Sequence, residues 1–101
     1  MKQMPYEWIH DDSFETMHSF TQFINWISGE FVLYQQENID GLKVFFPNGC
    51  FLIKELNLKN NAIGFRIAVK SKCLKNGTQI FNQIVSILTH AKIFHSEYIN
   101  N

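Results

Sequence analysis

The stretch from Phe31 to Lys70 constrains the fold most, because it holds four runs of β-forming residues separated by turn signals. The runs cover 31–36, 42–46, 50–58 and 62–70. Asp40-Gly41 is a hairpin signal. Pro47-Asn48-Gly49 is typical of a type I turn whose glycine takes the left-handed conformation, and Lys59-Asn60-Asn61 forms the last turn. Connections this short join antiparallel neighbours, so the sequence predicts a four-stranded antiparallel meander over 31–70.

The segment before the meander has the pattern of an amphipathic helix. Its apolar residues recur every three or four positions and share one helical face, namely Phe14, Met17, Phe20, Ile24 and Ile27. Asp12 and Glu15 have the spacing of a capping box, and Gly29 has the position of a helix stop. The sequence therefore predicts a helix over 13–28.

A second amphipathic segment follows the meander. Asn76, with Gln79 three residues later, can cap a helix, and the stripe behind it comprises Ile80, Ile84, Ile87, Leu88 and Ala91. This predicts a helix over 77–93. Residues 1–12 are then an N-terminal arm and 94–101 a tail.

These elements predict one domain of 101 residues in the α+β class. Their order is helix, four antiparallel strands, helix (αββββα), and two helices of this length are expected to pack on the sheet, most simply side by side on one face. The arm, with Tyr6 and Trp8, is expected to be docked, either as an edge strand or across the core.

The middle strands carry large apolar groups on both faces. Val44 and Phe46 face one side and Phe45 the other, and Leu52 opposes its neighbours Phe51 and Ile53. If both helices cover one face, the other needs the arm, a second copy of the chain or a partner. We favour closure within the chain, by the arm or by one helix on each face.

The charges are divided unequally along a chain whose formal net charge is zero. Residues 1–40 hold seven acidic residues and one lysine, whereas residues 41–95 hold eight basic residues and one glutamate. Such asymmetry bears on partners rather than on fold. The halves either attract each other across the surface or present a field to a partner.

The sequence carries no motif of catalysis, of metal binding or of nucleotide binding. The four histidines lack ligand spacing, and Cys50 and Cys73 form neither a CxxC pair nor a disulfide framework. We favour free thiols over a bridge between these two cysteines, and we expect no metal, no cofactor and no enzymatic activity. Without a signal peptide or a long apolar run, the chain is expected to be cytoplasmic and not to bind membranes.

A nucleic-acid-binding module is one alternative function. The basic residues Lys54, Arg66, Lys70 and Lys72 fall on the last two predicted strands and the link after them. A basic sheet with aromatic residues can bind single strands. An isoelectric point near 6.9 and a single arginine argue against it, because dedicated binders are usually strongly basic.

The interpretation that we favour is a cytoplasmic protein that binds and inhibits another protein. A small, neutral, motif-free chain with an acidic half resembles, as a class, the immunity proteins of bacterial contact-dependent and polymorphic toxin systems. That resemblance implies tight binding to one cognate toxin, often a nuclease, whose active site is occluded. It carries over no residue.

The acidic half supplies the candidate contacts with a basic partner, with one tyrosine as an aromatic anchor. These candidates are Asp11, Asp12, Glu15, Tyr34, Glu37 and Asp40. A further alternative is a homodimeric accessory subunit that closes the second sheet face, so the chain is expected to be a monomer or a homodimer.

Overall fold

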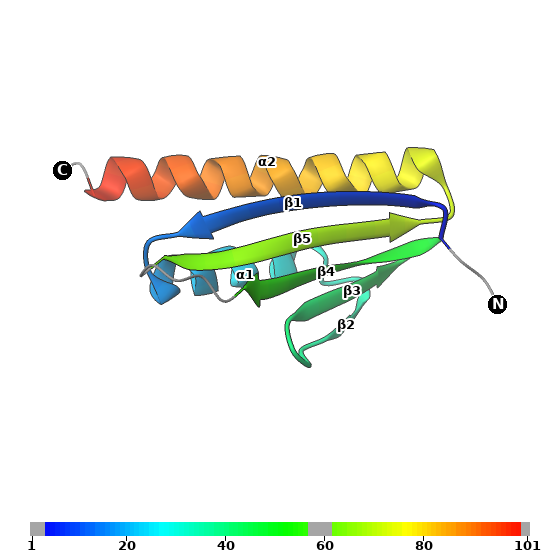
Figure 1. Cartoon of the computed structure of the whole chain (residues 1–101), viewed down its shortest axis with the longest axis horizontal. Helices are drawn as coiled ribbons and strands as arrows, with labels where there is room; N and C mark the ends of the chain where they lie inside the picture. The colour runs from blue at the N-terminus through cyan, green and yellow to red at the C-terminus, as the bar shows by residue number, and fades with distance from the viewer. Residues whose placement is uncertain (1–3, 57–61, 100–101) are drawn as a thin grey trace.

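The computed structural model describes residues 4–56 and 62–99, with side chains described as far as Phe94. The elements in chain order are β1 (Tyr6–Phe14), α1 (Met17–Glu30), β2 (Gln35–Glu37), β3 (Leu42–Phe46), β4 (Gly49–Leu56), β5 (Ile63–Ser71) and α2 (Leu74–Ile99). The strands form one antiparallel sheet in the order β1-β5-β4-β3-β2 (Figure 1). The α+β class is confirmed, with five strands rather than four.

The predicted helix-first order is wrong, because the segment taken as an arm and a helix start is the strand β1. Nine residues of β1 pair with β5, from Tyr6 opposite Ser71 to Phe14 opposite Ile63. Pairing of this length satisfies the backbone groups of 6–14 that point toward β5, and it buries the Phe14 side chain in the core. A helix that began with a capping box at Asp12 would have lost this pairing and the burial of Phe14.

Helix α1 therefore begins four residues later than predicted. Thr16 is its N-cap, and the Thr16 hydroxyl accepts a hydrogen bond of 3.1 Å from the Ser19 amide. The helix also runs through Gly29 to Glu30. It ends at Phe31, whose amide donates to the Ile27 carbonyl.

The first predicted strand of the meander is mostly a turn. Phe31 is only 2% exposed, and its ring meets Phe51 edge-on with centroids 5.0 Å apart. Burying this ring bends residues 31–34 into a turn, so β2 keeps only Gln35–Glu37. Residues 57–58 of the third predicted strand, and the predicted turn at 59–61, lie outside the described residues.

The turn chemistry differs from the prediction at one position. Asp40 and Gly41 have positive φ angles of 60° and 124°, as the Asp-Gly signal requires. In the next hairpin Asn48, at φ 72°, takes the left-handed conformation that the sequence assigned to Gly49. Gly49 instead allows close approach, because a Cβ there would overlap the Lys70 carbonyl oxygen.

Helix α2 is longer than predicted at both ends. The buried Ser71 hydroxyl accepts a hydrogen bond from the Cys73 amide, and the Cys73 carbonyl accepts the bond from Gly77 that opens the helix. Asn76 therefore lies in the first turn rather than at the cap. The predicted tail continues the helix to Ile99, and residues 100–101 lie outside the described residues.

Both helices pack on the same face of the sheet, which we call the covered face. Phe65 of β5 is fully buried there, with ring centroids 5.5 Å from Phe14, 5.3 Å from Phe20 and 5.5 Å from Phe23. The α2 residues Ile84, Ile87, Leu88 and Ala91 complete the same core. Figure 1 shows α1 behind the strands and α2 along β1, with no helix in front of the sheet. Closure by the arm, or by one helix on each face, is thus wrong for the described residues.

Candidate protein-binding surface

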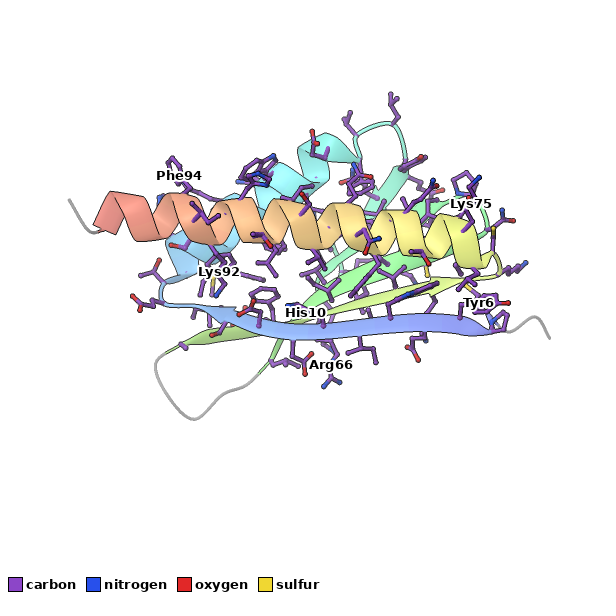
Figure 2. The ribbon with its side chains drawn as sticks, turned by 90° about the horizontal axis from the view of Figure 1, so that it is seen from above. Tyr6, His10, Arg66, Lys75, Lys92 and Phe94 are labelled. Atoms are coloured by element: carbon purple, nitrogen blue, oxygen red, sulfur yellow. The ribbon has the colours of Figure 1, made fainter. Side chains whose placement is uncertain are left out.

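The uncovered side of the sheet is the candidate site, and we call it the open face. It consists of alternate residues of the five strands, and the pairing register brings them into rows across the sheet. Its members are Glu7, Ile9, Asp11, Ser13, Gln35, Glu37, Lys43, Phe45, Cys50, Leu52, Lys54, Leu56, Gly64, Arg66, Ala68 and Lys70. Arg66 in Figure 2 projects from the sheet on the side away from α2.

The centre of the open face is apolar. Ile9, Ala68 and Leu52 lie side by side in one row, and Cys50 and Phe45 are neighbours in the next. Ile9 is 53% exposed, whereas the other four are half-buried. Long basic side chains beside them cover part of this surface with their aliphatic stems, and the Lys43 ammonium lies 5.2 Å from the Phe45 ring centroid.

Ion pairs frame this apolar centre. Arg66 donates two hydrogen bonds to Asp11, of 2.7 and 2.9 Å. The Lys54 ammonium lies 3.0 Å from the Asp40 carboxylate, and the Lys70 ammonium 4.0 Å from that of Glu7. These pairs join the acidic first part of the chain to its basic second part, as the internal-attraction interpretation of the charge asymmetry expects. All of them are exposed to solvent, which screens the charges, so they contribute little to folding.

The Asp11–Arg66 pair shifts both ionisation equilibria. The Arg66 hydrogen bonds hold the pKa of Asp11 below its ordinary value, and Asp11 in turn raises the pKa of Arg66. In register, Arg66 is also opposite Lys54. A row of four charged residues, Asp11, Arg66, Lys54 and Asp40, therefore crosses the sheet with its two cations on inner strands and a carboxylate at each end.

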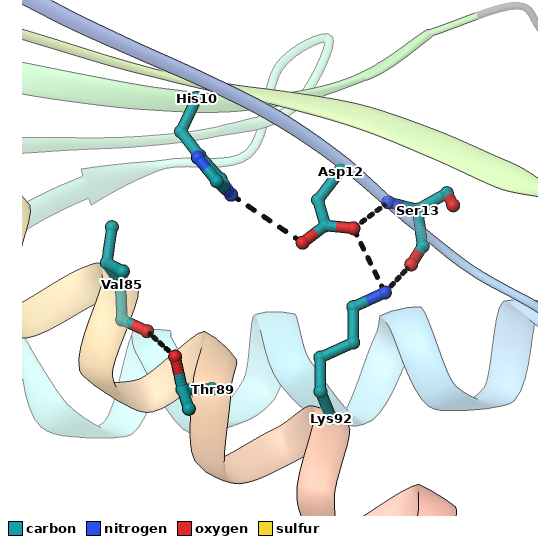
Figure 3. A network of polar contacts seen from close by, with 6 residues as sticks. All are labelled: His10, Asp12, Ser13, Val85, Thr89 and Lys92. Atoms are coloured by element: carbon teal, nitrogen blue, oxygen red, sulfur yellow. Dashed lines mark hydrogen bonds and ion pairs between the residues drawn. The ribbon is translucent and has the colours of Figure 1, made fainter.

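A second polar cluster lies on the opposite side of β1 and clamps α2 to that strand (Figure 3). The Lys92 ammonium lies 3.0 Å from Asp12, donates to the Ser13 carbonyl and sits 4.8 Å from the Phe14 ring centroid. His10 Nε2 is 3.6 Å from the other Asp12 oxygen. Burial alone would raise the pKa of Asp12, but the Ser13 amide and Lys92 together hold it below its ordinary value.

The structure separates the six predicted partner-binding residues. Asp11 and Glu37 lie on the open face, and Asp40 borders it in the loop before β3. Asp12 turns toward α2 in the clamp. Glu15 lies in the bend between β1 and α1. Tyr34 follows α1, with its ring stacked on Phe31 at 6.1 Å. The placement of the binding site on these six residues stays a prediction.

Three of the four alternative basic residues converge on the open face, since Lys54, Arg66 and Lys70 all project from it. Lys72 follows β5, and its amide donates to the Asn48 carbonyl. Sequence reasoning placed Leu52 on the face opposite Phe51 and Ile53, but it did not single out Ile9, which shares the apolar row with Leu52. The period-two pattern of residues 6–14 was the available signal for Ile9, and it was interpreted as an arm leading into a helix.

A notch of about 340 Å³ lies between α1 and the loop before β3. Phe20 and Ile24 line one wall, and Asp40, Lys54 and Glu55 the other. Residues 4–56 and 62–94 contain no group of three or more side chains placed to hold a metal ion. Cys50 and Cys73 are free thiols.

Within the described part of the chain, neither helix combines the length and the hydropathy needed to cross a bilayer. Comparison with models of known protein families and with curated proteins found no match to this chain.

Proposed function

We propose that the protein binds and inhibits another protein, in the manner that the resemblance to immunity proteins implies, and that its partner docks on the open face. The observation that carries the proposal is an uncovered sheet face whose apolar centre, Ile9, Ala68 and Leu52, is framed by charged side chains. An apolar centre within a polar rim is the usual anatomy of a protein interface.

The distribution of charge on this face selects the chemistry of the partner. The cations Lys43, Lys54, Arg66 and Lys70 lie on the inner strands β3, β4 and β5. The carboxylates of Glu7 and Asp11 lie on the border strand β1, and those of Glu37 and Asp40 at the other border. A protein settling over the apolar centre meets carboxylates on both flanks. The partner is therefore a basic protein surface with an apolar ridge between its basic side chains.

The test compares two single variants as bait. Leu52→Glu places a carboxylate in the apolar centre, and Thr21→Glu places the same group on the exposed side of α1. Each variant is first shown to fold by circular dichroism. Quantitative mass spectrometry then identifies proteins from the native host that the wild type and Thr21→Glu retain and Leu52→Glu loses.

A protein captured in this way is purified and tested in two assays. The proposal expects a 1:1 complex with the wild-type chain, and growth arrest by that protein that is relieved when the chain is co-produced in the cytoplasm. A purified protein that binds wild type and Leu52→Glu equally well overturns the placement on the open face. Failure of every captured protein to bind in purified form overturns the function.

Nucleic acid is the second candidate partner, favoured by the convergence of Lys54, Arg66 and Lys70 on one face. Against it, carboxylates border these cations on both flanks of the face and would repel a phosphate chain that extends past the inner strands. Fluorescence anisotropy with a single-stranded oligonucleotide tests it. Binding that weakens steeply with added salt would support this candidate, and no binding in low salt would exclude it.

A homodimer that buries the open face is the third candidate, favoured by the apolar row itself. Two aligned copies stacked by a two-fold axis would place border carboxylates against border carboxylates, which opposes the pairing. Analytical ultracentrifugation tests the homodimer, since a monomer at high concentration excludes it.

A further inference from the structure

The outer edge of β1 is a second exposed feature of the sheet, separate from the open face. β1 is nine residues long and pairs with β5 on one side only, and it is a border strand of the sheet. No described residue pairs with its other edge. The opposite border strand, β2, has only three residues. A long border strand presents a row of backbone N–H and C=O groups that another strand can pair with.

Helix α2 packs beside this edge. It runs along the whole of β1 (Figure 1), and its residues contact β1 through an aromatic stack and an ion pair. Trp8 stacks on Phe81 at 6.5 Å, and Lys92 binds Asp12. Figure 3 shows Val85 and Thr89 on α2, which packs against the strand that carries His10. A strand added to β1 would thus find the half-buried side chains of Phe81 and Val85 beneath it.

The charge of β1 restricts which strand can be added. The strand carries Glu7, Asp11 and Asp12 and no lysine or arginine. Glu7 and Asp11 each bind a cation of β5 on their inner side, yet their side chains are each 46% exposed. A second copy of β1 would bring six carboxylates together, so the edge opposes self-pairing. A basic strand is attracted to the same edge.

We infer that the edge of β1 accepts an extended basic segment of the partner as a sixth strand of the sheet. The inference rests on the proposed function and specifies the partner further. In an antiparallel pair, the residues opposite Glu7, Ile9 and Asp11 alternate along the added strand. The segment therefore has a basic residue, an apolar residue and a second basic residue at every other position, with small or apolar residues between them facing α2.

The test uses a synthetic seven-residue peptide of threonine, capped at both ends, with lysine at its second and sixth positions and valine at its fourth. Three control peptides carry glutamate in place of both lysines, proline in place of the valine, or the same residues in scrambled order. Each is titrated into isotopically labelled protein, and the backbone amide signals are followed by NMR.

The expected result is saturable binding of the lysine peptide alone, with shifts confined to β1 and the facing side of α2 and with slower hydrogen exchange of the β1 amides. The double variant Glu7→Gln/Asp11→Asn should bind this peptide about fivefold more weakly, because two exposed charge pairs are removed. The matched double variant Glu30→Gln/Glu55→Gln, with equal loss of charge outside β1, should bind it as the wild type does.

Equal binding of the lysine and glutamate peptides, or shifts that map outside β1 and α2, would overturn strand addition. So would failure of the lysine peptide to bind. The lysine peptide could fail to bind while a purified partner binds the wild type and not Leu52→Glu. That pair of results would rule out strand addition and leave the proposed function supported.

Discussion

Consecutive residues of β5 belong to two different environments. Phe65, Ile67 and Val69 are fully buried beneath the helices, whereas the side chains of Arg66 and Lys70 between and beyond them are 48% and 55% exposed on the open face. The covered face consists of close-packed aromatic and aliphatic groups. The open face consists of ion pairs around a small apolar row.

This difference separates the two tasks of the sheet. Burial of apolar area is the dominant favourable term in folding, so the covered face supplies nearly all of the stability. Exposed ion pairs add little to folding, and side chains that fold without a partner are free to meet one. Substitutions on the two faces should therefore differ first in what they do to unfolding, and then in what they do to binding.

Phe65→Ala should have the largest effect on stability. It removes a fully buried ring that packs against three other rings, and such truncations cost about 3–5 kcal/mol. Phe45→Ala, on the open face, should cost about 1 kcal/mol because that ring is only half-buried. Urea unfolding followed by circular dichroism measures both. Equal losses would contradict the division between the faces.

Gly77→Ala should come next. A methyl group at Gly77 would overlap the Trp8 ring at the start of α2, and overpacking of this kind costs about 1–3 kcal/mol. Gly29→Ala is the matched control, because nothing lies within 4 Å of the added carbon and alanine favours helix by about 1 kcal/mol. The midpoint temperature of thermal unfolding should therefore fall in Gly77→Ala and rise in Gly29→Ala. A rise in the unfolding temperature of both variants would show that the Trp8 ring moves to accommodate the methyl group.

Asp12→Asn should give a smaller loss that depends on pH. The folded protein lowers the pKa of Asp12, so the carboxylate stabilises the fold above its unfolded pKa of about 3.9 and ceases to do so as the pH falls through the lower folded pKa. We expect a cost of about 1 kcal/mol at pH 7, allowing for partial exposure, that disappears near pH 2. Urea unfolding at both pH values measures it. A loss that persists in acid would show that the amide disrupts packing instead.

Ile9→Thr should have the smallest effect on folding. The side chain is 53% exposed and threonine is also favoured in strands, so the free energy of unfolding should change by less than about 0.5 kcal/mol. The same change should weaken a complex formed on the open face, measured by calorimetry with the purified partner. Ile67→Thr, one row away on the covered face, should destabilise the fold severely. An affinity that Ile9→Thr leaves unchanged would show that the partner binds outside the open face.

Local patterns in the sequence predict the elements whose contacts are local. The hairpin of β3 and β4 and the apolar side of β5 follow from turn residues and alternation, and they are observed. An edge strand was one of the two placements expected for the arm, and it is observed, but its continuation to Phe14 was missed because Asp11, Asp12 and Ser13 have the chemistry of a helix start. Their actual partners are residues 64–66, more than fifty positions along the chain. No local propensity reports a pairing at that separation.

The same limit applies to the candidate site. The charge asymmetry identified Asp11, Glu37 and Asp40, and the basic strands identified Lys54, Arg66 and Lys70, as residues of interest. Their assembly on one face depends on which strands are neighbours. Ile9 meets Ala68 and Leu52 only because β1 joins the sheet beside β5, and the sequence-based prediction placed Ile9 in the arm.

The pairing of β1 with β5 also has a consequence for how the chain folds. Strand β1 comes first in the chain, yet it can enter the sheet only after residues 63–71 have been synthesised. Contacts at such separation raise the contact order and slow folding. During synthesis β2 to β5 can form hairpins in succession, while β1 remains unpaired and Trp8 is exposed. Closure of the sheet should therefore be a late step, reported by the fluorescence of Trp8 in a variant that replaces Trp26 with phenylalanine.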